Sequence, residues 1–175
     1  MGKVRAAQNT KRFTYRSRTI NRLAHDSIHA IIRSMTEVVV VDTSVFVAAL
    51  KSSDGASRQV MRLCFRSDLS PIMGHKLFLE FNDVFERPGL FDPGPATHAD
   101  REALFHGFLS VCRWVNIYFL WRPNLPDEGD NHVLELAVAG GAAVVITHNV
   151  SDFAGELTFP GVHVLAPGQF LRMKR

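Results

Sequence analysis

The segment VVVVDTS at residues 38–44 decides the predicted fold of this chain. Four consecutive β-branched residues are too few for a helix, and they are typical of a strand buried on both faces of a parallel sheet. Asp42 closes the run and, with the two hydroxyl residues after it, forms a turn and cap for a helix over 44–50. Ligands of α/β proteins bind beside the carboxyl ends of such strands, so Asp42 is the first candidate site residue.

Strand-like and helix-like segments alternate along the rest of the chain. Strands are predicted at 38–41, 70–73, 115–121, 142–147 and 162–165, and helices at 44–50, 56–66, 74–87, 99–113, 130–139 and 167–172. This alternation predicts an α/β fold of three layers, α/β/α, with a mainly parallel central sheet. Right-handed crossovers would bring the carboxyl ends of the strands to one edge.

Composition limits the class of protein. The 175 residues suffice for one domain with a real core, and 46% of them are hydrophobic. No apolar run approaches the roughly 18 residues of a membrane helix, and the basic N-terminus lacks the apolar segment of a secretory signal. Cys64 and Cys112 lie in apolar, helix-like contexts, so we expect them to fill the core of a cytoplasmic protein.

Charge divides the chain into a leader, residues 1–35, and a domain, residues 36–175. The leader holds eight Lys or Arg residues and one acid, whereas acids outnumber bases in the domain. Two interpretations of the leader stay open. A basic arm adds salt-dependent affinity for nucleic acid. Alternatively, the leader is a disordered or non-native extension, since Met35 stands just before the first strand.

Four further acids lie at the ends of apolar segments or beside them. They are Glu80 within KLFLEF, Asp127 and Asp130 around the start of a predicted helix, and Asp152 after the strand at 142–147. Carboxylates gathered in one crevice repel each other by roughly 3 kcal/mol per pair at about 5 Å with an effective dielectric near 20. Protonation or a hard divalent cation relieves this repulsion. A site made only of oxygen ligands suits Mg²⁺ or Mn²⁺ and points to phosphodiester chemistry.

Each acid also has a plainer interpretation as a helix cap, a turn residue or a solvated side chain. The hypothesis of a divalent-cation site therefore rests on the joint placement of the acids. Ser44, Thr147 and Asn149 are candidate supporting residues, with ordinary strand-end or turn roles as the alternative. His132 and His148 are isolated in the sequence and form no zinc pattern with the cysteines.

These residues resemble the PIN-domain ribonucleases, of the kind found as VapC-type toxins of toxin–antitoxin pairs. Four segments carry the resemblance: VVVDTSVF with Asp42, GHKLFLEF with Glu80, LPDEGDNHVLELA with Asp127 and Asp130, and VITHNVSDF with Asp152. The similarity extends from about residue 38 to 170 and leaves out the leader.

The resemblance implies a Mg²⁺- or Mn²⁺-dependent endoribonuclease acting as the toxin of a type II pair. It implies an RNA substrate, a homodimer, and a cognate antitoxin that places a segment over the acidic pocket. Asp42, Glu80, Asp130 and Asp152 would be catalytic, and Asp127 would join them as a metal ligand. Many relatives have Asp where this chain has Asn149, which leaves the fourth acidic position open between Asn149 and Asp152.

Other hypotheses come from different classes. A PIN-like module that binds RNA or protein without cutting is favoured by Asn149 and by the basic leader. A phosphatase with an aspartate nucleophile needs a second Asp two residues after Asp42, where this chain has Ser44. A dinucleotide-binding domain needs a Gly-rich loop after the first strand, which is absent. The aromatic residues Trp114, Tyr118 and Trp121 fit a dimer surface, but such residues more often fill a core.

Overall fold

The computed structural model describes residues 36–91, 94, 96–120, 125, 128–153 and 161–174. The predictions for residues 1–35, for Asp127 and for Trp121 therefore lie outside the described residues. The strands are β1 (Glu37–Val41), β2 (Leu69–Met73), β3 (Arg113–Trp114), β4 (Val144–Ile146) and β5 (His163–Leu165). The α-helices are α2 (Thr43–Lys51), α3 (Ala56–Phe65), α4 (His75–Glu86), α5 (His98–Val111), α6 (Asn131–Gly140) and α7 (Pro167–Met173), and two 3₁₀ turns are η1 (Glu128–Asp130) and η2 (Val150–Phe153).

The five strands form one parallel sheet in the order β3-β2-β1-β4-β5. The chain builds outward from β1 through β2 to β3, then returns to the other side of β1 with β4. The order therefore reverses between β1 and β4, which is where open α/β sheets bind their ligands. Asp42 follows β1 and Thr147 follows β4, so both stand at this reversal. The prediction of a mainly parallel sheet is confirmed.

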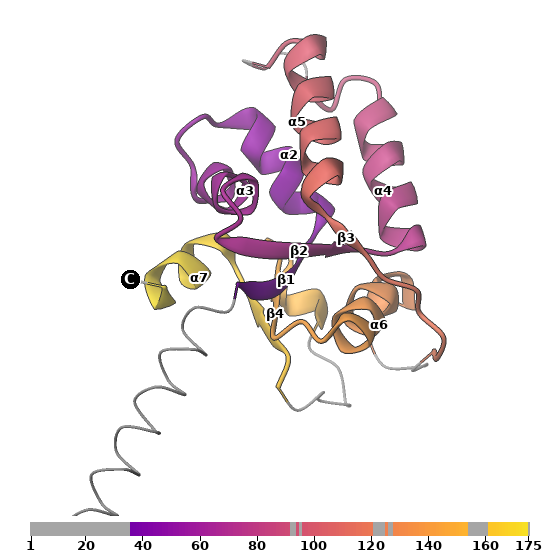
Figure 1. Ribbon diagram of the computed structural model, residues 1–175. Coiled ribbons are helices and arrows are strands. Elements are labelled where there is room, and N and C mark those ends of the chain that lie inside the picture. The colour runs from indigo at the N-terminus through magenta and orange to yellow at the C-terminus, as the bar shows by residue number, and fades with distance from the viewer. Residues whose placement is uncertain are drawn as a thin grey trace, which may run out of the picture. The chain divides into compact units, whose positions relative to one another are not determined.

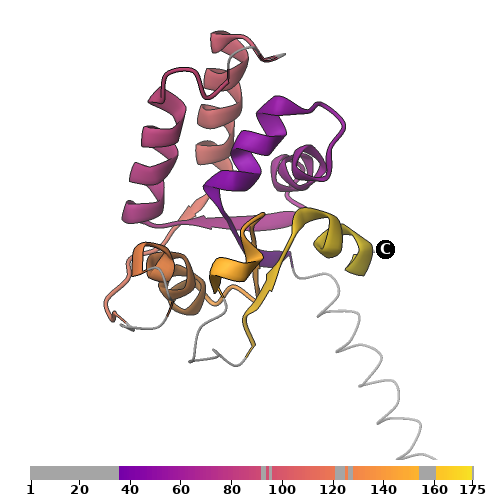
Figure 2. The same ribbon diagram turned by 180° about the vertical axis from the view of Figure 1, so that it is seen from behind.

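Helices cover both faces of the sheet (Figure 1). Helices α2, α3, α4 and α5 lie on one face, and α6 packs on the other against β1, β2 and β4. The view from behind shows the same three layers (Figure 2). The predicted α/β/α architecture is thus confirmed.

The core lies where the central strands meet the helices on either face. Val39, Val40 and Val145 are fully buried, as a strand covered on both faces requires. A stack of phenylalanines fills the space between α2, α4 and α5, with Phe81 5.3 Å from Phe46 and 5.6 Å from Phe108 between ring centroids. This packing fixes α4, which carries Glu80, against α2, which begins beside Asp42.

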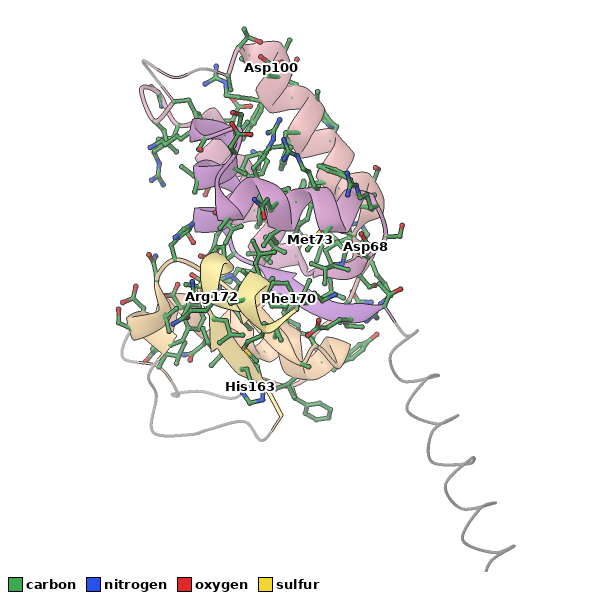
Figure 3. The ribbon with its side chains drawn as sticks, turned by 90° about the vertical axis from the view of Figure 1, so that its left-hand side faces the viewer. Asp68, Met73, Asp100, His163, Phe170 and Arg172 are labelled. Atoms are coloured by element: carbon green, nitrogen blue, oxygen red, sulfur yellow. The ribbon has the colours of Figure 1, made fainter. Side chains whose placement is uncertain are left out.

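Helix α7 completes the domain beside α3, and Figure 3 labels Phe170 and Arg172 on it. Phe170 is buried whereas Arg172 is exposed, so one side of this short helix faces the core. The thiol of Cys64 is also buried, which raises its pKa to about 12 and leaves it protonated at neutral pH. Within the described part of the chain, no helix combines the length and apolar character that a membrane crossing requires.

The predicted strand at 115–121 is wrong. The edge strand is Arg113–Trp114, and residues 115–120 form no strand. The helix predicted to end at Arg113 ends at Val111, because the chain there turns to pair with β2. The aromatic residues that suggested a buried strand are on the surface, with Trp114 55% and Tyr118 82% exposed. The expectation that Trp114 and Tyr118 fill the core is therefore wrong as well.

Candidate active site

Asp42 sits at the carboxyl end of β1 with its backbone fixed by the neighbouring strand. Its N–H donates to the carbonyl of Ile146 at 3.0 Å, which extends the β1–β4 pairing by one residue. Its carbonyl accepts from the N–H of Val45 at 3.0 Å and so opens α2. The side chain is only 8% exposed. Sheet and helix together leave this carboxylate little freedom.

Two hydroxyl groups donate to the same oxygen of Asp42. Ser44 Oγ lies 2.5 Å from Oδ2, and Thr147 Oγ1 lies 2.8 Å from it. Each hydroxyl has one proton, so both protons are used, and the 3.3 Å separation between the two hydroxyl oxygens is only a contact. Their lone pairs accept backbone N–H groups, Ser44 from His148 and Thr147 from Asn149, each at 3.0 Å. We call this group, Asp42, Ser44 and Thr147, the hydroxyl cluster.

The other carboxylate oxygen, Oδ1, is nearly unoccupied. From the residues that the structure describes it receives only a weak contact, that of Thr43 Oγ1 at 3.4 Å. Among the described residues no Lys, Arg or His forms a salt bridge with Asp42. A buried carboxylate that keeps its charge needs a positive partner, and an oxygen with free lone pairs offers that partner a ligand. The donor chemistry of Asp42 therefore fits a hard divalent cation.

Glu80 lies on α4 and faces the start of α6. Its Oε2 lies 3.1 Å from Nε2 of His132, a histidine that is 2% exposed, whereas Glu80 is 35% exposed. The other ring nitrogen of His132, Nδ1, lies 2.7 Å from the carbonyl oxygen of Gly129. We call Glu80, His132 and Gly129 the histidine cluster. It ties α4 to η1, and the same carbonyl also accepts from Lys76 Nζ at 2.8 Å.

The two contacts of His132 constrain its protons. A carbonyl oxygen only accepts, so Nδ1 carries a proton. In the neutral ring Nε2 is then an acceptor and cannot donate to Glu80, so a bond between them requires a second proton on the pair. The geometry agrees with a close but poorly directed approach, because Nε2 makes no hydrogen bond with any described residue although it lies 3.1 Å from the carboxylate.

The structure places the remaining predicted residues as follows. Asp130 is the last residue of η1 and the N-cap of α6, and it is half-buried. Asn149 and Asp152 are both exposed. The N–H of Asn149 reaches the hydroxyl cluster, whereas the carboxylate of Asp152 accepts from Ser151 Oγ at 3.2 Å. In the part of the chain that the structure describes, no three His, Cys, Asp or Glu side chains gather as one metal site.

Sequence reasoning assigned no role to His132 or His148, and the structure gives each of them a side-chain contact. His132 contacts Glu80, and His148 Nε2 lies 2.8 Å from Ser57 Oγ. One signal was present at the start of α6. Polar residues at 131, 132 and 135 sit among apolar ones, and all three side chains are buried. Asn131 Oδ1 accepts from the N–H of Leu125 at 3.0 Å, so this polar end of α6 binds the backbone of Leu125.

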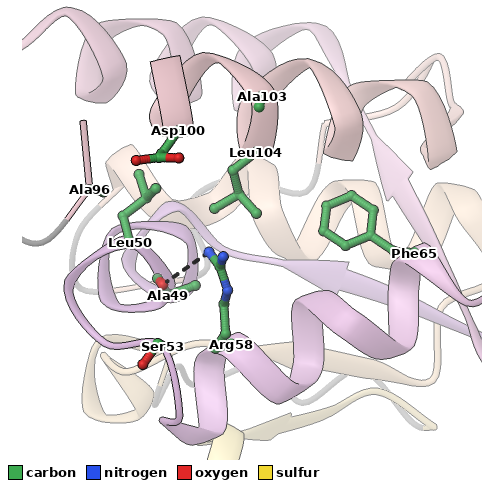
Figure 4. Close-up of a pocket in the computed structure, with 9 residues that line it drawn as sticks. All are labelled: Ala49, Leu50, Ser53, Arg58, Phe65, Ala96, Asp100, Ala103 and Leu104. Atoms are coloured by element: carbon green, nitrogen blue, oxygen red, sulfur yellow. Dashed lines mark hydrogen bonds between the residues drawn. The ribbon is translucent and has the colours of Figure 1, made fainter. Parts of the chain in front are cut away.

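One cavity lies away from both clusters. It measures about 370 Å³ between the end of α2, the start of α3 and the start of α5 (Figure 4). Arg58 crosses it and approaches the carbonyl of Ala49 at 3.4 Å, with Leu50 and Leu104 as apolar walls. Figure 3 shows Asp100, which also lines it, at the end of α5 remote from the sheet. None of the predicted site residues lines this cavity.

Comparison with known proteins places this geometry in context. The PIN domain family matches residues 38–151, which include both clusters. A solved structure, the crystal structure of VapBC2 from Rickettsia felis bound to a DNA fragment from their promoter, is similar at 11% identity with a TM-score of 0.49. That similarity covers 74% of this chain and 98% of the other. No curated protein matches the chain.

Proposed function

Because the chain belongs to the PIN domain family, we propose that it is a metal-dependent endoribonuclease, the VapC-type toxin of a type II toxin–antitoxin pair. PIN domains are generally nucleases that use divalent metals. The observation that carries the proposal is the state of Asp42, a buried carboxylate. Among the described residues, one of its oxygens receives only the weak contact from Thr43, and it has no cationic partner. This is the arrangement that a cation ligand needs.

The proposed metal ligands are the predicted acids Asp42, Glu80, Asp127 and Asp130, and a further position is open between Asp152 and Asn149. Mg²⁺ and Mn²⁺ suit such oxygen donors, and when bound they supply positive charge that stabilises phosphoryl transfer. The hydroxyl cluster keeps Oδ1 of Asp42 available by committing Oδ2 to Ser44 and Thr147. One of these carboxylates would act as the general base and accept the proton of the attacking water.

The test is cleavage of a pool of cellular RNA by the purified protein with Mg²⁺, with Mn²⁺ and with EDTA. We expect Asp42→Asn to lower the cleavage rate by at least about 100-fold, since it removes a charged ligand while keeping the side-chain shape. Asp54→Asn is the matched control, because Asp54 is exposed and, within the described ranges, its carboxylate accepts only from Ser53 at 3.0 Å. Cleavage by Asp42→Asn at the parental rate would contradict the assignment of Asp42 as a metal ligand.

A non-catalytic module that binds RNA or protein is the second candidate. It is favoured by the absence of three gathered ligands among the described residues, and by Asn149, where many members of the family that the sequence resembles have Asp. Isothermal titration with Mn²⁺ separates the two candidates. Heat of binding that disappears in Asp42→Asn supports the nuclease, and no binding by the parental protein supports the second candidate.

Two protein partners belong to the proposal. A cognate antitoxin is expected from the resemblance to VapC-type toxins, with a segment over the acidic pocket. A homodimer is expected as well, and exposed apolar side chains support it: Trp114, Tyr118, Phe119 and Leu120 are 55–82% exposed. Three of these side chains are consecutive in the chain, and exposed apolar patches mark protein interfaces. The molar mass in solution by light scattering tests the dimer, and a monomer at high concentration would contradict it.

A further inference from the structure

A cavity of about 350 Å³ opens between α2 and α4, directly beside the hydroxyl cluster. Both helices begin at the carboxyl edge of the sheet and pack against each other as they leave it. Ser44, which donates to Asp42, lines this cavity together with Thr43. We infer that the cavity binds one nucleotide of a single-stranded RNA beside the cleaved bond, which rests on the proposed nuclease function.

Two cations point to a phosphate in this cavity. Lys51 in the last turn of α2 and Arg87 at the C-cap of α4 both line it, and among the described residues no Asp or Glu lines it. Both side chains are exposed. Neither forms a salt bridge or a side-chain hydrogen bond with another described residue. Two uncommitted cations at one cavity are a site for a single anionic group.

His148 connects this cavity to the catalytic carboxylate. Its backbone N–H donates to Ser44 Oγ at 3.0 Å, and its ring nitrogen Nε2 lies 2.8 Å from Ser57 Oγ. Ser57 is buried on α3, so the exposed imidazole is held at both its backbone and its ring. The wall of the cavity nearest Asp42 is therefore fixed, and an RNA strand lying there passes the carboxylate in a defined register.

The floor between these polar groups is apolar. Val47, Val84 and Leu90 form it and are only partly buried, so they are open to a ligand. A ribose or a base covers such a surface better than a free phosphate ion does. The volume lies at the lower end of ligand sites, roughly 300–1,000 Å³, which suits one nucleotide rather than a folded structure.

Besides binding RNA, Lys51 and Arg87 have two alternative roles, and each of the three roles predicts a different effect of their substitution. Both cations complement the dipoles of the helices that they end, a role that concerns stability and not RNA. An acidic protein segment would satisfy the same charges. The apolar floor and the adjacency to Asp42 favour RNA, and the experiment separates all three roles.

The experiment measures binding of a fluorescein-labelled uridine oligonucleotide to the full chain by anisotropy, in EDTA and at several salt concentrations. The double variant Lys51→Gln/Arg87→Gln is compared with Arg66→Gln/Arg172→Gln, which removes two exposed cations from α3's end and from α7. We expect the first pair of substitutions to weaken RNA binding about tenfold. The slope of log affinity against log salt concentration should become shallower by roughly 0.7 for each lost phosphate contact. The control pair should change affinity less than about twofold.

Each outcome decides the inference. Lys51→Arg should keep most of the affinity, and thermal unfolding checks that every variant is folded. Equal losses in the two double variants, or no loss in either, would overturn the cavity assignment even if the parental protein cuts RNA. A glutamate oligopeptide that displaces the RNA at matched ionic strength, and that loses affinity in the same double variant, would assign the cavity to an acidic protein segment. Cleavage by the parental protein is measured separately, so the nuclease proposal stands or fails on its own.

Discussion

Asp42 and Glu80 are both proposed to hold the same cation, yet the molecule positions them by different means. Asp42 is fixed by two adjacent strands, and hydroxyl groups on either side of it commit one carboxylate oxygen. Glu80 stands on a helix, is 35% exposed, and meets a buried histidine from a second helix. Neutral donors leave the charge of Asp42 unbalanced, whereas His132 offers Glu80 a partner that carries charge when protonated.

Because the two carboxylates are held differently, we expect substitutions in the two clusters to have different consequences. A strand end is set by the hydrogen-bond ladder, so the hydroxyl cluster keeps its geometry whether or not a ligand is bound. The histidine cluster depends on η1, which holds α4 through the carbonyl of Gly129. We therefore expect loss of a hydroxyl to affect chemistry, and loss of the histidine to affect chiefly the stability of the contact between α4 and α6.

Among the substitutions that compare the groups supporting the two carboxylates, Thr147→Val is expected to have the largest effect. The substitution keeps the shape of a fully buried side chain but removes the proton donated to Asp42 Oδ2 at 2.8 Å. Groups that orient a metal ligand typically contribute 10–100-fold to activity, so we expect a loss of about that size in RNA cleavage.

Thr97→Val is its matched control. Thr97 caps α5 through Asp100, so its loss should cost about 1 kcal/mol of stability while leaving cleavage unchanged. Chemical denaturation and cleavage rates measured on both variants separate the two effects. A parallel loss of activity in the two would show that Thr147 acts through stability alone.

A smaller effect is expected from His132→Leu. The variant keeps the apolar volume but leaves Gly129 without the 2.7 Å bond from Nδ1, so the free energy of unfolding should fall by about 1–2 kcal/mol. His98→Leu offers a direct comparison, because His98 pairs with Glu102 at 3.6 Å on the surface, and we expect a change within about 0.5 kcal/mol. Urea denaturation measures both, and equal losses would show that burial of the His132 contact is unimportant.

The sequence predicted one cluster better than the other for a physical reason. Asp42 and Thr147 both follow buried β-branched strands, and parallel strands bring their carboxyl ends to one edge, so local pattern and topology agree. The link between Glu80 and His132 joins two helices 52 positions apart in the chain, and their pairing depends on how those helices pack. No periodicity in either helix encodes that contact.

Edge strands show the same limit. The aromatic run after Arg113 suggested a buried strand, but pairing with β2 stops after Trp114, apart from one bond from Val115 N–H to the carbonyl of Met73. A strand at the edge has one partner and one free side, so its length is set by where the neighbouring strand ends. Composition alone gives no information on that, and aromatic residues there remain at the surface.

The smallest effect concerns the fourth acidic position, where Asn149 and Asp152 compete. The backbone N–H of Asn149 donates to Thr147 Oγ1 at 3.0 Å, which places this residue next to the hydroxyl cluster, whereas Asp152 is exposed on η2 and accepts from its neighbour Ser151. Replacing Asn149 with Asp adds a carboxylate beside Asp42, and we expect Mn²⁺ to bind several-fold more tightly because ligand charge raises affinity for a hard cation. Asp152→Asn should change that affinity by less than about twofold. Titration calorimetry of both variants decides between the two residues. If Asp152→Asn causes the larger change in Mn²⁺ affinity, Asp152 fills the fourth acidic position and η2 contributes a metal ligand.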